Sequence, residues 1–278
     1  MRALGDSVIR AVGLEHVYDG EVAALGGVDL DIRRGDFIGL IGQNGSGKTT
    51  LAKHFNGLLR PTSGRVEIDG ADIAGVNVSR IARKVGFVFQ NPDHQVFCPT
   101  VREECAFGPR NIGLGKDEIE LRVEDALARF KIRKYADHPP AVLGFGIRRK
   151  VSLAAVYAMR PDALILDEPT VGLDWKSSME LMEVVRGLNE AGHTIVLITH
   201  DMRIVAEFTT RSVVLKAGRV IMDATTREVM SDRDALRSTQ IAPPQVVDLS
   251  RDLEPLGLGV ALSSGEFAEA YYRAAAAV

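Results

Sequence analysis

Cysteines are scarce in this sequence, and neither sign of charge is strongly in excess. Only two cysteines, Cys98 and Cys105, occur among 278 residues. Their spacing is not typical of a zinc site or of a disulfide framework, and a reducing compartment fits such a chain best. The formal net charge is −3. The sequence therefore gives no support for a basic surface that binds nucleic acid.

Long apolar runs are also missing. No segment approaches the ~20 apolar residues that a membrane-spanning helix needs. Residues 1–6 lack the apolar stretch of a signal peptide. We therefore expect the chain itself to be soluble. With 278 residues, of which 46% are hydrophobic, one or two domains are expected.

The most informative feature is a glycine-rich loop at residues 42–49, which fits the pattern G-x-x-x-x-G-K-[ST]. An apolar run at 37–41 precedes it, and residues 50–55 read as the first turns of a helix. In such a strand–loop–helix context, backbone N–H groups converge on phosphate oxygens. Lys48 would contact the β- and γ-phosphates, and the Thr49 hydroxyl would ligate Mg²⁺. The predicted nucleotide-binding residues of this segment are Gly42, Asn44, Gly45, Ser46, Gly47, Lys48, Thr49 and Thr50.

Polar residues follow three further apolar runs. Asp167 and Glu168 end one of them, where an open α/β sheet places its catalytic groups. Asp167 would hold the magnesium ion, and Glu168 would orient or deprotonate the attacking water. His200 follows the run at 194–199 and could donate to a γ-phosphate. Gln90 similarly follows the run at 86–89, although on its own an amide there is often only a satisfied polar group.

The remaining pattern divides the chain into segments. Short β-like runs before residue 35 and a turn at 69–70 predict an antiparallel element beside the loop. Residues 93–160 carry mainly helical periodicity and read as an insertion between strands. Residues 213–222 predict a closing hairpin. The pattern changes from residue 226, and an alanine-rich helix is expected at 266–278.

Taken in order, these motifs resemble the nucleotide-binding subunit of ABC transporters over about the first 225 residues. The resemblance implies an α/β fold with a P-loop NTPase (RecA-like) core. It also implies that Tyr18 stacks on adenine, that Gln90 senses Mg²⁺ and couples to a membrane partner, and that Asp174 contacts the second subunit of a dimer. His200 would be the γ-phosphate switch.

More narrowly, residues 89–97, 100–104 and 106–109 are similar to the ATPases of energy-coupling factor and cobalt/nickel uptake systems. Those systems import micronutrients. Their ATPases carry a C-terminal extension that contributes to dimer contacts, a role that residues 226–278 would suit. We expect residues 90–108 and the helical insertion to dock on the membrane partner.

One motif departs from the family. The expected Leu-Ser-Gly-Gly-Gln signature aligns with residues 143–147, where Gly144 replaces the serine and Phe145 the first of the two glycines. Gly146 is retained, and Gly144 and Gly146 would still face a nucleotide held by the other subunit. A missing hydrogen bond to a charged group should weaken such a site by about one to two orders of magnitude. A homodimer would contain this defect twice, so the sequence favours a heterodimer with a sister ATPase, unless Arg148 compensates.

The sequence therefore predicts a Mg²⁺- and ATP-dependent ATPase at residues 1–225, followed by a dimerisation extension at 226–278. We expect it on the cytoplasmic face of the membrane as a peripheral subunit, with a second ATPase subunit and transmembrane coupling and substrate-binding subunits as partners. The alternatives are a soluble ABC-type ATPase not coupled to transport and a catalytically weak, regulatory one.

Overall fold

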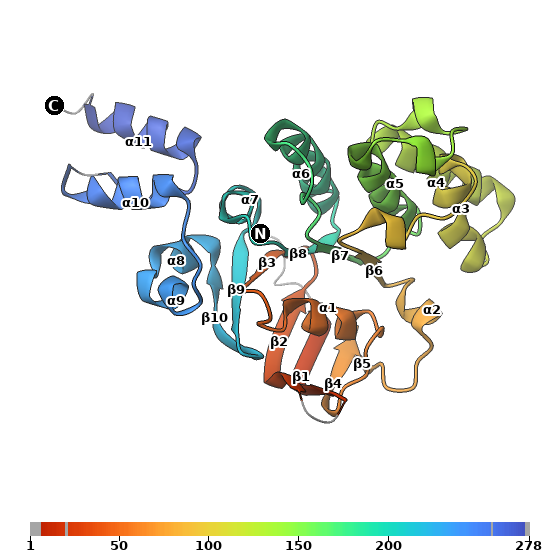
Figure 1. The fold of residues 1–278 in the computed structure, drawn as a ribbon, viewed down its shortest axis with the longest axis horizontal. Helices are drawn as coiled ribbons and strands as arrows, with labels where there is room; N and C mark the ends of the chain where they lie inside the picture. The colour runs from red at the N-terminus through yellow and green to blue at the C-terminus, as the bar shows by residue number, and fades with distance from the viewer. Residues whose placement is uncertain (1–6, 20–21, 257, 276–278) are drawn as a thin grey trace.

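The computed structural model describes residues 7–19, 22–256 and 258–275. Two sheets form its centre, and helices cover them on several sides (Figure 1). Among the described residues, no helix is long and apolar enough to cross a membrane.

The smaller sheet is the predicted antiparallel element. It has four strands in the order β2-β1-β4-β5. Strand β1 lies between β2 and β4 and pairs antiparallel with both. The strands are β1 (Ser7–Tyr18), β2 (Val22–Arg33), β4 (Ser63–Ile68) and β5 (Ala71–Asp72). The turn at 69–70 joins β4 to β5, as the sequence predicts.

The larger sheet carries the nucleotide motifs. It has six strands in the order β10-β9-β3-β8-β7-β6, and only the hairpin strand β10 runs antiparallel to its neighbour. Strands β3, β7 and β8 are buried at every position, which explains their uninterrupted apolar runs. The strands are β3 (Phe37–Ile41), β6 (Val85–Val88), β7 (Ala163–Asp167), β8 (Thr194–Ile198), β9 (Arg211–Lys216) and β10 (Arg219–Thr225).

Three helices directly follow strands of this sheet. Asp174 caps the second of them by accepting a hydrogen bond from the Ser177 backbone N–H at 2.7 Å, and Asp201 caps the third in the same manner. The first helix begins at Lys48, two residues earlier than the sequence pattern indicates, and has no side-chain cap. The helices are α1 (Lys48–Phe55), α6 (Trp175–Glu190) and α7 (Met202–Phe208).

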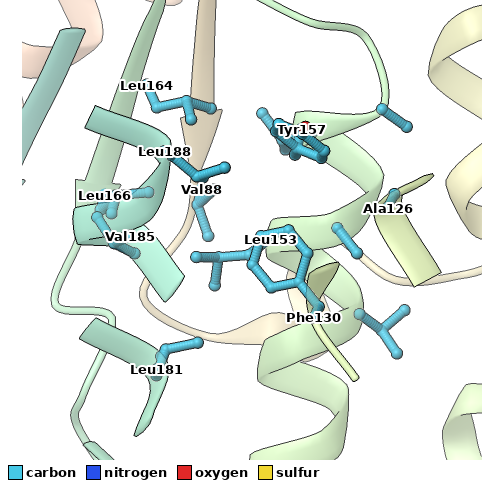
Figure 2. Packing of buried hydrophobic residues seen from close by; sticks show 14 of the residues in the cluster. Val88, Ala126, Phe130, Leu153, Tyr157, Leu164, Leu166, Leu181, Val185 and Leu188 are labelled. Carbon is cyan, nitrogen blue, oxygen red and sulfur yellow. The ribbon is translucent and has the colours of Figure 1, made fainter. Parts of the chain in front are cut away.

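The predicted helical insertion lies at the β6 edge of the larger sheet (Figure 1). Its side chains share a core with that sheet: Leu153 and Phe130 from the insertion lie in the same apolar cluster as Leu166 and Val88 (Figure 2). The insertion is therefore anchored to the strands that carry Gln90 and Asp167. Its elements, with the short helix before them, are α2 (Val78–Ile81), η1 (Pro92–His94), α3 (Val101–Asn111), α4 (Lys116–Arg129), η2 (Arg133–Tyr135), η3 (Pro140–Val142) and α5 (Phe145–Tyr157).

The segment after residue 225 is helical and is not wholly separate from the sheet. Val229 and Met230 pack in one cluster with Ile41 and Val214 of β3 and β9. The buried hydroxyl of Thr226 lies 2.8 Å from that of Thr209. The last helix begins at Ser264 and has no buried residue; of the expected helix, residues 276–278 lie outside the described part. The helices are α8 (Thr226–Ser231), α9 (Arg233–Ser238), α10 (Gln245–Asp252), η4 (Glu254–Leu256) and α11 (Ser264–Ala275).

Candidate nucleotide-binding site

The predicted site residues meet at the carboxyl ends of the parallel strands. The loop at 42–47 follows β3, Asp167 ends β7, and His200 follows β8, the strand that lies between those two. On β7's other side, Val88 of β6 pairs with Leu166. Gln90 therefore leaves the sheet at the same end as the two acidic residues, which is where ligands bind to such sheets.

The loop adopts a conformation that requires glycine at two close approaches. A Cβ atom on Gly42 would lie 2.3 Å from the Leu215 carbonyl oxygen, and one on Gly47 would lie 2.7 Å from that of Ala24. Both glycines have positive φ, 153° and 103°. The turn at Gly47 leads directly into α1, so the N-terminal amides of that helix face the loop.

Lys48 lies across this loop. Its Nζ donates to the carbonyl oxygens of Gly42 at 2.7 Å and Gln43 at 2.9 Å. Burial lowers the pKa of the ammonium group, while Glu168 and Asp167 act in the opposite direction. The cation is thus held inside the concave face of the loop, close to two carboxylates.

Thr49 and Asp167 form the second contact of the site. The Thr49 hydroxyl donates to Asp167, with Oγ1 lying 3.2 Å from Oδ2 and 3.4 Å from Oδ1. Burial raises the pKa of Asp167, and the hydrogen bond from Thr49 lowers it. One hydroxyl and one carboxylate therefore stand together as hard oxygen ligands of the kind that Mg²⁺ prefers.

Glu168 follows Asp167 in the sequence, and its backbone has an uncommon left-handed conformation. Its φ is +49°, and its N–H donates to the Ile198 carbonyl of the neighbouring strand at 2.8 Å. Nδ1 of His200 lies 3.0 Å from its Oε1. Its other carboxylate oxygen, Oε2, is buried without a partner among the described residues. A non-glycine residue with positive φ is strained, and such residues cluster at functional sites.

Tyr18 ends strand β1, and Gln90 follows strand β6. The Tyr18 hydroxyl lies 3.2 Å from Oγ1 of Thr50, so the end of β1 is tied to the start of α1. Gln90 is exposed. The backbone N–H of the preceding residue, Phe89, donates to Oε1 of Gln95.

The signature segment opens helix α5. Gly144 is its N-cap, exposed, with no atom within 4 Å of where its Cβ would lie. Phe145 packs on Gly172: a Cβ there would approach the Phe145 ring to 2.8 Å. A Cβ on Gly146 would come within 3.3 Å of Leu173. The bulky Phe145 therefore contacts the segment that ends in Asp174, the exposed cap of α6.

Two arginines behind the signature carry contacts that sequence reasoning does not reveal. Arg149 is fully buried, donates to the Phe89 carbonyl at 2.9 Å, and has its guanidinium 5.3 Å from the Phe145 ring. Its burial lowers its pKa. Arg148 donates to the Leu143 carbonyl at 2.7 Å and pairs with Asp93 at 3.0 Å. A basic run at 148–150 gives no signal of these contacts, because they depend on which loops lie opposite.

The residues present fit a magnesium–nucleoside triphosphate complex. The buried hydroxyl of Ser46 and Oε2 of Glu168 have no partner in the described structure. A lysine, a hydroxyl–carboxylate pair and a set of loop amides surround the same point. Buried polar atoms without partners destabilise a fold, so their presence favours a site that a polar ligand completes.

Comparison with known proteins gives the family. The model of the ABC transporter family matches residues 25–171. A putative ABC transporter ATP-binding protein of Caldanaerobacter subterraneus is 45% identical over 93% of this chain. The energy-coupling factor transporter ATP-binding protein EcfA2 of Clostridium tetani is 42% identical over 91% of this chain and 91% of its own length.

Solved structures agree. CbiO1 of Clostridium perfringens, part of the ABC transporter complex CbiONQ, superposes with a TM-score of 0.77 at 36% identity, over 88% of this chain and 99% of its own. A dimeric ATP-binding cassette bound to ADP and Pi gives a TM-score of 0.70 at 28% identity, over 78% of this chain and 98% of its own. These matches confirm the predicted P-loop NTPase fold with a helical insertion.

The chain belongs to the ABC transporter family and is an ABC-type ATPase. Within that family, it resembles the ATP-binding subunits of energy-coupling factor transporters, as its sequence motifs indicate. The chain spans only 46% of the length of the Caldanaerobacter relative. What its whole assembly binds and transports is therefore a matter for proposal.

Proposed function

We propose that this chain is the ATP-hydrolysing subunit that energises import of a micronutrient, a vitamin or a transition-metal ion, through a membrane-embedded partner. Relatives named as energy-coupling factor transporter ATP-binding proteins support this proposal, as does the structural neighbour CbiO1, which is part of the ABC transporter complex CbiONQ. The observation that carries it is the convergence of Lys48, the Thr49–Asp167 pair and Glu168 at one edge of the sheet.

In this proposal, the loop amides and Lys48 bind the phosphates, and the Lys48 ammonium balances their charge. Thr49 and Asp167 hold a magnesium ion, with Gln90 as a further ligand; that ion supplies charge neutralisation at the transferred phosphoryl group. Glu168 accepts the proton of the attacking water. His200, already bonded to Glu168 through Nδ1, orients that carboxylate and contacts the γ-phosphate.

The proposed docking surface for the membrane partner is an apolar hollow of about 280 Å³ on the helical insertion. Phe97 and Phe107 line it, exposed at 68% and 42%, and their rings meet edge to face at 4.9 Å. Gln95, which accepts a hydrogen bond from the Phe89 backbone, also lines it. A helix seated there would press on the residues that lead into Gln90.

Arg102 lies within residues 90–108, the segment expected to dock on the membrane partner, but its side chain is held by contacts inside the insertion. It lies 2.8 Å from both Glu120 and Glu124 of the next helix in the insertion. These ion pairs hold α3 against α4. A charge reversal at Arg102 would therefore disturb the insertion itself, and the apolar hollow is the better place to test docking.

We also propose that the chain works in a dimer whose two nucleotides lie between subunits, with the C-terminal helices contributing to the contact. Helix α11 has no buried residue, and Tyr271 and Tyr272 on it are 51% and 72% exposed. In this proposal Gly144, Gly146 and Asp174 face the partner's nucleotide. The Arg148 side chain contacts Leu143 and Asp93, so it does not replace the hydrogen bond that the missing serine would donate. This favours a heterodimer with a sister ATPase that has an intact signature.

The proposal is tested by purifying the tagged chain from membranes of its native cells and identifying the proteins that accompany it. Transport coupling predicts an integral membrane subunit and ATP turnover that rises when this subunit is present. High turnover without any membrane partner would favour a soluble ATPase instead. Nucleotide binding without turnover, even in the complex, would favour a regulatory subunit.

A further inference from the structure

Two buried histidines lie behind Tyr18 and take no part in the chemistry proposed above. His16 is on β1 and His54 on α1, and both are buried. Nε2 of His54 lies 3.2 Å from Nδ1 of His16, and the ring centroids are 4.7 Å apart. The two imidazoles therefore share one hydrogen bond between the small sheet and the helix that follows the phosphate loop.

The partners of each ring define its protonation. Nδ1 of His54 lies 2.7 Å from the Thr50 carbonyl oxygen, so this nitrogen carries the proton and Nε2 of the neutral ring is an acceptor. Nδ1 of His16 faces that acceptor and also the Arg60 carbonyl oxygen at 3.1 Å. With two acceptors opposite, Nδ1 of His16 must carry its proton too. Both rings are thus neutral, with the proton on Nδ1.

A second proton on His54 would break the arrangement, because it would point Nε2–H at the N–H of His16, donor against donor. Nε2 of His16 is buried with no partner among the described residues. Burial lowers the pKa of His54, while hydrogen bonds to the carbonyls of Thr50 and Arg60 act in the opposite direction. Arg60, Arg65 and Asp72 are the charged side chains that line the cavity of about 200 Å³ beside His54.

The pair is linked to Tyr18 by two contacts. The His16 ring meets the Tyr18 ring edge to face, with centroids 4.4 Å apart and an interplanar angle of 83°. The Tyr18 hydroxyl lies 3.2 Å from Oγ1 of Thr50, the residue whose carbonyl accepts the His54 proton. These contacts form a closed ring of four residues: Tyr18, His16, His54 and Thr50.

We propose that His16 and His54 are positioning residues that hold Tyr18 against the adenine ring of a nucleotide only while the His54 imidazole is neutral. This rests on the proposed function and on the adenine contact of Tyr18 that the family resemblance implies. The new element is that the adenine contribution to nucleotide affinity depends on pH. The phosphate contribution does not depend on the histidine pair.

The direction of the pH effect follows from the neutral geometry. A free imidazole has a pKa of about 6.5, and burial lowers the pKa of His54 in the folded chain. Below about pH 6.5, proton uptake by His54 competes with the paired state, so Tyr18 loses its support and base affinity falls. Above about pH 7 the pair is intact and base affinity is complete.

The test compares the affinities of Mg-ADP and Mg-pyrophosphate for the full chain by titration calorimetry from pH 5.5 to 8. Pyrophosphate has no base. The affinity for Mg-ADP divided by the affinity for Mg-pyrophosphate therefore isolates the contact with Tyr18, and this quotient is the ratio used below. An aromatic contact and a hydrogen bond each contribute on the order of 1 kcal/mol. We therefore expect the ratio to fall roughly 3- to 10-fold between pH 7.5 and 5.5.

Three variants test whether the histidine pair causes this fall in the affinity ratio. His54→Asn keeps an amide donor for the Thr50 carbonyl and cannot be protonated, so its ratio should vary less than about twofold over the same range. Tyr18→Ala should lower the ratio at pH 7.5 and make it independent of pH. His193→Asn is the matched control, because His193 also bonds a carbonyl, that of Pro161, but belongs to the loop before β8. It should behave as the wild type.

The possible results separate the two proposals. A ratio that does not change with pH in the wild type, or that still falls in His54→Asn, overturns the role of the histidine pair. If Tyr18→Ala leaves the Mg-ADP affinity unchanged, the adenine contact itself is wrong and both proposals about Tyr18 fail. Should His54→Asn fail to fold, as judged by thermal unfolding, His54→Gln tests the same point, since its amide also donates without titrating.

Discussion

At the scale of single residues, the nucleotide site keeps features that destabilise a folded chain. Ser46 and Glu168 each bury a polar atom without a partner in the described structure, and Glu168 has a φ of +49°. Buried unpaired groups cost about 1–3 kcal/mol each. The Ser46 hydroxyl can donate to a phosphate oxygen, and Oε2 of Glu168 can accept from the attacking water. We therefore expect Mg-ATP to raise the midpoint of thermal unfolding.

Replacing Lys48 with alanine should abolish tight Mg-ATP binding. Lys48 is the buried cation of the phosphate loop, and the variant leaves the phosphate charge without it. Charge-assisted hydrogen bonds of about 1.5–3 kcal/mol each predict a loss of about 100-fold or more in affinity. Calorimetry measures this, with Lys116→Ala, an exposed lysine on α4, as the control. Equal affinities in the two variants would contradict the phosphate-loop assignment.

At the scale of elements, one side chain connects three loops. Arg149 of α5 donates to the Phe89 carbonyl, next to Gln90, and its guanidinium covers the Phe145 ring that packs on Gly172. The signature, the segment before Gln90 and the segment before Asp174 are thus joined within one subunit.

The elements themselves were largely predictable, and their contacts were not. Strands β3, β7 and β8 are buried throughout, so their sequences are unbroken apolar runs that a pattern can identify. The phosphate loop and the acidic pair are local motifs. The buried pairing of His16 with His54 joins residues 38 positions apart, and the packing of Val229 on Ile41 joins residues from opposite ends of the chain. Such contacts depend on tertiary structure, which local patterns do not contain.

Restoring the family's signature residues at positions 144 and 145 should raise ATP turnover. Gly144 has φ −59° and ψ 154°, with open space around it, so a serine fits there as an N-cap. In a homodimeric preparation, Gly144→Ser with Phe145→Gly should raise ATP turnover by about one to two orders of magnitude. Phe145→Leu alone, which keeps an apolar side chain, serves as the control. If turnover did not rise, the altered signature at residues 144 and 145 would not be what limits ATP hydrolysis.

The apolar hollow on the insertion should transmit the membrane partner's effect. Phe107→Ser should reduce partner-stimulated turnover by about tenfold and leave basal turnover within twofold, because it removes apolar contact area worth about 1.5–3 kcal/mol far from the phosphates. Leu121→Ser on α4 is the matched control, since Leu121 is also exposed. Parallel losses of both activities in Phe107→Ser would indicate a disturbed insertion instead.

At the scale of the whole molecule, the chain presents complete catalytic groups beside an incomplete signature. A symmetric homodimer would place the same Gly144-Phe145-Gly146 segment over both nucleotides. Pairing with a sister ATPase would instead bring an intact signature to this chain's phosphate loop. The assembly would then have one strong site and one weak site.

Native mass spectrometry of the membrane complex should therefore find two different ATPase chains. We expect one copy of this chain and one copy of a sister that carries the Ser-Gly-Gly signature. A complex containing two copies of this chain alone, with turnover typical of ABC dimers, would contradict the heterodimer proposal. The complex should be prepared with Mg-ATP, because the nucleotides lie at the proposed interface.

ATP turnover in the purified complex, compared between wild type and Glu168→Gln, tests the central claim most directly. The glutamine keeps the shape of the side chain but cannot accept a proton, so Mg-ATP should bind with unchanged affinity in the variant. Turnover should fall by the roughly 10²- to 10⁴-fold that loss of a general base produces. Turnover near that of the wild type, with Mg-ATP bound, would contradict the claim that Glu168 prepares the water for hydrolysis.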